Sequence, residues 1–119
     1  MNKLIFEIGG EQRGFIIGLG FLGDMLNHFD TDIQGIGKMA INNNIFALCP
    51  TCVYYGHKHY CMSEKKPIDF TLYDVEQWLL DLENGMFNKN VQELLSLMTK
   101  TLTSHLGHLI GEEGKEKKN

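Results

Sequence analysis

The residues of this chain with the clearest chemical potential lie in the segment from Cys49 to Cys61. It contains Cys49-Pro50-Thr51-Cys52, followed by His57, His59 and Cys61. Thiolate and imidazole are preferred zinc ligands, so one hypothesis is a small zinc- or thiol-dependent regulatory or binding module centred on this segment. However, only four residues separate Cys52 from His57. That spacing is too short for the loop that usually lets two ligand pairs converge.

The same segment also has the apolar spacing of a helix. One helical face would carry Ile45, Leu48, Cys52, Tyr55 and His59. Pro50 would lie in the first turns of this helix or at a kink. A redox role for the Cys-x-x-Cys pair is not expected, because no βαβ pattern accompanies it. We therefore predict an amphipathic helix here and no metal site.

A second chemical pattern is G-x-G-x-x-G, formed by Gly18, Gly20 and Gly23 between an expected strand and an expected helix. A dinucleotide-binding fingerprint occupies this position in a βαβ unit, whose second strand runs parallel to the first. Here the incoming strand is the return arm of a hairpin, and no apolar β-run follows the helix. We interpret these residues as packing glycines on a buried helix and predict no cofactor.

Two weaker metal patterns are also rejected. Asp30 to Gly35 resembles the start of an EF-hand loop, but Ile41 stands at the twelfth position, where calcium needs a bidentate Glu. Thr31 or Asp32 is better interpreted as a helix N-cap. His105 and His108 lie three residues apart without an acidic ligand on the same turn, so we expect half-exposed helix residues.

No acid, base and nucleophile converge in the pattern, and no serine lies in a nucleophile elbow. The sequence predicts no catalytic, cofactor-binding or metal site, and hence no enzyme. A net charge of -4 with 11 Lys and Arg argues against a nucleic-acid groove. No apolar run approaches the ~20 residues that span a bilayer, and no signal peptide is evident. We expect a cytosolic protein with reduced thiols.

The elements that position these residues begin with a hairpin. Leu4 to Ile8 and Glu11 to Ile17 alternate as strands around Gly9-Gly10, which suits a primed two-residue turn. A lone hairpin is marginal in water, so its apolar face must pack on helices or on a partner chain. Its two unpaired edges predict self-association, and a head-to-tail contact would give a ring or a spiral.

Helical spacing predicts the rest of the chain. We expect helices over about 19–29, 31–39 and 45–60, a loop over 62–69, and two further helices starting at Thr71 and at Asn88 or Asn90. Asp74 completes a capping box with Thr71, and Asn84-Gly85 ends that helix. The expected buried positions of these two helices are Val75, Trp78, Leu79, Leu82, Val91, Leu94, Leu95, Met98, Leu102, Leu106 and Leu109.

The predicted fold class is α+β, mainly α, with an N-terminal β-hairpin followed by about four to five helices. Residues 1–110 form a single domain, and residues 111–119 contain no apolar side chain and form a disordered polar tail.

Three segments carry a resemblance to a known family. Lys3 to Leu26, Val53 to Gly56 and Asp69 to Leu79 resemble tail assembly chaperones of long-tailed, siphovirus-like bacteriophages or prophages. The resemblance covers most of Lys3 to Leu109 in order, through short apolar motifs. The three cysteines are not part of the family pattern, which favours the helical interpretation of their segment.

The resemblance implies a non-enzymatic protein of the host bacterial cytoplasm. Such a chaperone binds the long helical tape measure protein and aids assembly of the tail tube protein around it. The resemblance also implies self-association, often as spiral or helical oligomers, and absence from the mature virion.

Overall fold

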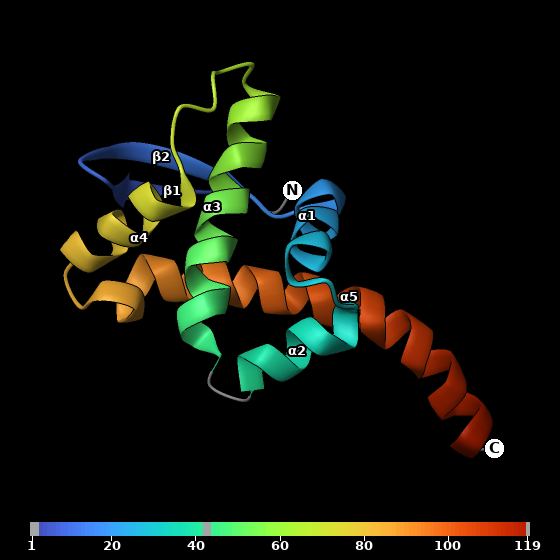
Figure 1. Ribbon diagram of the computed structural model, residues 1–119. Coiled ribbons are helices and arrows are strands. Elements are labelled where there is room, and N and C mark those ends of the chain that lie inside the picture. The colour runs from blue at the N-terminus through green and yellow to red at the C-terminus, as the bar shows by residue number, and fades with distance from the viewer. Residues whose placement is uncertain (1–2, 42–43, 119) are drawn as a thin grey trace.

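The computed structural model describes residues 3–41 and 44–118, with side chains described as far as residue 105. Within this part of the chain, an antiparallel hairpin precedes five α-helices and one 3-10 helix (Figure 1). The expected fold class, mainly helical α+β with an N-terminal hairpin, is therefore confirmed. In chain order the elements are β1 (Lys3–Ile8), β2 (Glu11–Ile16), α1 (Leu19–Phe29), α2 (Ile33–Ile41), α3 (Ile45–Ser63), α4 (Leu72–Asp81), η1 (Gly85–Phe87) and α5 (Lys89–Lys118).

The hairpin closes through the expected two-residue turn. Ile8 pairs with Glu11 across the turn, and Lys3 pairs with Ile16 at the open end. Gly9 and Gly10 both have positive φ, 64° and 82°, as a type I′ turn requires. The inner face of the hairpin contributes Phe6, Ile8 and Phe15 to the core, and Ile17, directly after β2, is also buried.

α3 lies at the centre of the molecule and contacts β2 and every other α-helix (Figure 1). The helix predicted over 45–60 is present, but it differs from the prediction in two respects. Buried residues occupy most of the circumference of α3, because the hairpin and four helices surround it. The helix also continues to Ser63, into the expected loop. Pro50 lies in the second turn, as expected for a position near the helix start.

Side-chain caps explain where α2, α4 and α5 begin. Asp32 Oδ1 accepts the backbone N–H of Gly35 at 2.8 Å, so Asp32 is the cap of α2. Thr71 and Asp74 form the predicted capping box of α4, with reciprocal distances of 3.1 and 2.8 Å. Asn88 Oδ1 accepts the N–H of Asn90 at 2.9 Å at the start of α5.

The core lies between the hairpin, α3 and the buried faces of the other helices. The predicted buried positions of α4 and α5 are buried as far as Leu102, except that Trp78 and Leu82 are half-buried. Leu106, His108 and Leu109 lie outside the described side chains. The fully buried large side chains are Phe15, Phe21, Ile8, Ile17, Met25, Ile36, Leu48, Leu94, Met98, Val53, Val75 and Val91.

α5 is longer than expected, since it runs to Lys118 and includes the segment 111–118. That segment was expected to be a disordered tail. The domain boundary at residue 110 stays a prediction. Among the described residues, no helix combines the length and apolar character needed to cross a membrane.

Candidate functional site

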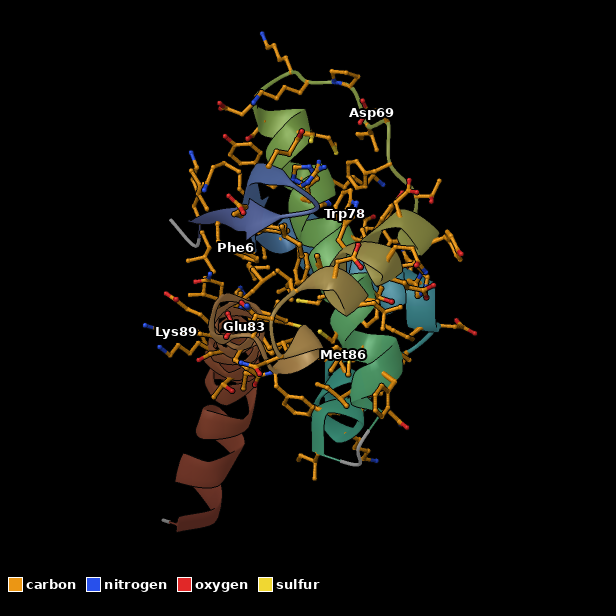
Figure 2. The ribbon with its side chains drawn as sticks, turned by 90° about the vertical axis from the view of Figure 1, so that its left-hand side faces the viewer. Phe6, Asp69, Trp78, Glu83, Met86 and Lys89 are labelled. Carbon is orange, nitrogen blue, oxygen red and sulfur yellow. The ribbon has the colours of Figure 1, made fainter. Side chains whose placement is uncertain are left out.

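An exposed apolar groove lies between α3, α4 and η1. We call it the α3–α4 groove and define it by its lining residues, Phe46, Pro50, Glu76, Leu79, Leu80, Gly85 and Met86. Its volume is about 230 Å³. Figure 2, which faces α4, shows Met86 beside the first turns of α3.

The local sequence of α4 explains why the groove has an apolar rim. Val75 and Leu79 are buried against the core, which turns the adjacent residue Leu80 outward. Leu80 is 74% exposed, and Phe46 on α3 is 76% exposed. These two side chains stand on facing elements of the groove.

The turn after α4 completes the groove. Asn84 and Gly85 both have positive φ, 67° and 56°, and they reverse the chain direction after α4. Met86 therefore returns to the groove and joins Phe46, Pro50 and Leu80 in its lining. Contiguous exposed apolar side chains of this kind mark interaction sites on soluble proteins.

The lining of the groove suits binding and not catalysis. Glu76 is its single charged side chain. No acid, base and nucleophile meet there, so the groove offers apolar contact with one carboxylate at its rim. Apolar grooves are one of the surfaces on which amphipathic helices bind in known complexes.

The cysteine and histidine residues of the zinc hypothesis are distributed along α3. Cys49 and Cys61 lie 12 positions apart on one continuous helix, which corresponds to about 18 Å of helical rise. No three His, Cys, Asp or Glu side chains among the described residues are arranged to hold a metal ion. The geometry therefore gives no support to the metal module.

The thiols of α3 are also poorly suited to thiol chemistry. Cys49, Cys52 and Cys61 are all buried. Burial raises the pKa of the Cys49 thiol to about 12. Burial, with a smaller contribution from Cys49, raises the pKa of Cys52 well above its ordinary value. Thiolate is the nucleophilic form, so these two groups are held in the unreactive form.

His57 connects α3 to the hairpin through a hydrogen bond. Its Nδ1 lies 2.8 Å from the carbonyl oxygen of Gly14, so we assign the proton to Nδ1 and the donor role to His57. Its Nε2 then faces Arg13 Nη1 at 3.5 Å and Cys61 Sγ at 3.6 Å. Burial lowers the pKa of His57, and the nearby Arg13 lowers it further against the opposing effect of the Gly14 hydrogen bond.

Arg13 links the hairpin to α4. Its guanidinium lies 3.9 Å from the centre of the Trp78 ring, and its Nε donates to the carbonyl of Ile8 at 3.0 Å. The alternation in the sequence placed Arg13 on the same strand face as Phe15 and Ile17. A cation on an apolar strand face is the sequence signal for stacking of this kind. The sequence prediction did not include the contact between Arg13 and Trp78.

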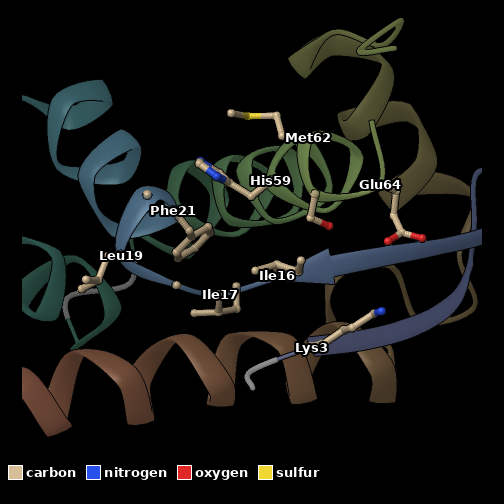
Figure 3. A pocket seen from close by; sticks show the side chains of 11 residues that line it. Lys3, Ile16, Ile17, Leu19, Phe21, His59, Met62 and Glu64 are labelled. Atoms are coloured by element: carbon tan, nitrogen blue, oxygen red, sulfur yellow. The ribbon is translucent and has the colours of Figure 1, made fainter. Parts of the chain in front are cut away.

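A different, wider groove of about 750 Å³ is lined by Gly18 and Gly20 of the glycine pattern (Figure 3). The interpretation as packing glycines was wrong for Gly18 and Gly23, because a Cβ at either position would meet open space. Gly20 alone lies close to another element, at the His59 ring. The strand that enters the pattern pairs only antiparallel among the described residues, so no Rossmann unit forms.

The opening of this wider groove has mixed charge. Lys3 and Glu64 both line it (Figure 3). His59 is turned toward α1, where its Nε2 lies 2.8 Å from Asp24 Oδ2. These charges do not make the uniform cationic lining that a phosphate ligand would favour.

The remaining sequence candidates have local structural roles. Asp30 is the left-handed C-cap of α1, with φ of 50°, and Asp32 caps α2. His105 is exposed, and its Nδ1 lies 2.8 Å from the carbonyl oxygen of Thr101, one turn earlier.

Comparisons of the chain with protein-family models, with curated proteins and with solved structures give no match.

Proposed function

We propose that this chain is a non-enzymatic phage tail assembly chaperone that binds apolar helices of the tape measure protein. The resemblance of Lys3 to Leu26 and of Asp69 to Leu79 to that family supports the proposal. The α3–α4 groove supplies a surface for it. In this proposal the bound client is kept apart from other chains until the tail tube protein assembles around it.

The observation that carries the proposal is the group of exposed apolar side chains at the groove. Phe46 and Leu80 are each more than two thirds exposed. Phe46 comes from α3 and Leu80 from α4, and both line the groove together with Met86 and Pro50. An amphipathic helix can place residues at i, i+3 and i+4 into such a groove.

The energetics fit a reversible complex. Fully burying one Leu or Phe side chain contributes about 1.5–3 kcal/mol. Two such side chains, Phe46 and Leu80, together contribute about 3–6 kcal/mol. At its upper end this exceeds the lower estimates of about 4 kcal/mol for lost translational and rotational freedom. The surplus is small, so the client can be released when the tail tube replaces the chaperone.

The test is coexpression with the tape measure protein encoded in the same genome, followed by copurification. Leu80→Asp replaces an exposed apolar side chain at the rim of the groove with a carboxylate and is expected to abolish copurification. Leu19→Asp is the matched control, because Leu19 on α1 is 73% exposed, close to the 74% of Leu80, and lies outside the groove.

The control variant is expected to copurify as the natural chain does. Equal loss in both variants, or retained binding in Leu80→Asp with unchanged helix content, would remove the groove as the client site. Failure of the natural chain to bind the tape measure protein would contradict the proposed function itself.

A further inference from the structure

The two edges of the hairpin differ in their surroundings. The outer edge of β2 is covered by α3, because His57 donates to the carbonyl of Gly14 and Tyr60 packs beside the same glycine. The outer edge of β1 receives no hydrogen bond from any described residue. Figure 2 shows the hairpin at the periphery of the molecule. β1 therefore presents an open strand edge.

The register identifies which backbone groups face outward. Ile8 and Glu11 flank the two-residue turn as a hydrogen-bonded pair, and paired positions then alternate along an antiparallel ladder. Lys3, Ile5 and Glu7 therefore direct their N–H and C=O groups away from β2. The outward carbonyl of Gly14, which pairs with Ile5, agrees with this alternation.

The side chains of these three residues are exposed on one face of the strand. Ile5 is 53% exposed and lies midway between a lysine and a glutamate. Neither Lys3 nor Glu7 has an ion-pair partner among the described residues. The Lys3 ammonium lies 5.2 Å from the centre of the Tyr60 ring, on the exposed side of the hairpin.

We propose that β1 pairs antiparallel with β1 of a second copy of this chain, about a two-fold axis at Ile5. In this register Ile5 lies opposite Ile5 of the second copy, and Lys3 lies opposite Glu7 of the second copy. Each of the three resulting pairs exchanges two backbone hydrogen bonds. The product is a continuous four-stranded antiparallel sheet.

The charge pattern of β1 indicates that its partner is β1 of a second copy and not an unrelated strand. The order lysine, isoleucine, glutamate is complementary to itself only when the two strands run antiparallel. The contact is isologous and closes as a dimer, unlike the head-to-tail contact expected from the sequence. This inference does not rest on the proposed function, because the β1 edge and the α3–α4 groove share no residue.

Charge reversal provides the test, read by sedimentation velocity over a wide concentration range. The natural chain is expected to form a dimer. Lys3→Glu and Glu7→Lys each place like charges opposite one another twice, so each is expected to weaken dimerisation by about tenfold or more. Both substitutions lie at exposed positions, and circular dichroism should show unchanged helix content.

Mixing the two variants is the decisive arm of the experiment. In the mixed pair, positions 3 and 7 of the Lys3→Glu chain both carry glutamate, and they face lysine at positions 7 and 3 of the Glu7→Lys chain. A heterodimer is therefore expected at about the natural affinity. A natural chain that stays monomeric to high micromolar concentration would overturn the proposal. Variants that dimerise as the natural chain does, or a mixture that fails to associate, would also overturn it.

Discussion

Gly14→Ala tests the close contact between Gly14 of β2 and the Tyr60 ring of α3, which fixes the hairpin against that helix. A Cβ at Gly14 would lie 2.5 Å from Tyr60 Cζ and would approach other atoms of that ring more closely, whereas ordinary contact begins at 3.4 Å. The ring must therefore retreat by about 0.9 Å or more. The ammonium groups of Lys3 and Lys66 lie 5.2 and 5.5 Å from the centre of the Tyr60 ring.

Overpacking of this kind costs about 1–3 kcal/mol. Because Tyr60 is half-buried and has some freedom to move, we expect the lower part of this range, about 1–2 kcal/mol. For a domain of this size, each 1 kcal/mol lowers Tm by about 4 °C. The assay is urea unfolding followed by circular dichroism, with thermal unfolding as a second measurement.

Two controls separate the contact from general effects of adding a methyl group. In a Tyr60→Ala background, Gly14→Ala should have no cost, because the colliding ring is absent. Gly23→Ala, where a Cβ meets open space within α1, should stabilise the protein by about 0.5–1 kcal/mol. A neutral or stabilising Gly14→Ala in the natural background would refute the reasoning.

The helix caps and buried groups give further predictions. Thr71→Ala removes the capping box of α4 and should cost about 1 kcal/mol in urea unfolding. Because folding lowers the pKa of His57, stability should fall as pH drops below the unfolded value of about 6.5 and level off below the lowered folded value. His57→Gln should reduce that slope. Cys49 and Cys52 should resist iodoacetamide at pH 8 until the protein is unfolded in urea. Elemental analysis of protein prepared without chelator should find no stoichiometric zinc. One zinc per chain, lost on Cys52→Ser, would contradict the interpretation of α3 as a buried helix whose cysteines bind no metal.

Local signals in the sequence were sufficient for the hairpin and for several helix ends. Gly9-Gly10 between two alternating strands predicts the turn that forms. Thr71 and Asp74 predict the start of α4, because a capping box depends only on residues three apart. These features are determined within a few residues.

Features that depend on distant residues were not predictable in this way. Periodicity in α3 indicated one apolar face, yet the hairpin and four helices bury most of its circumference. The close approach of Gly14 to Tyr60 joins residues 46 positions apart. No local pattern in either segment specifies that distance.

The α3–α4 groove was missed for the same reason. Phe46 and Met86 are 40 positions apart in the chain, and only the packing of α4 and η1 beside α3 brings them together. A sequence signal existed at Leu80, an apolar residue immediately after the buried Leu79. Its position off the buried stripe indicated an exposed apolar side chain without indicating its neighbours.

Hydrogen exchange of the complex tests the central claim most directly. The amides of the natural chain would be compared with and without the tape measure protein of the same genome. Client binding in the α3–α4 groove predicts added protection at the groove-lining ends of α4 and α3 and in η1, with little change in α1. Protection confined to α1 or the hairpin, or none at all, would contradict the account.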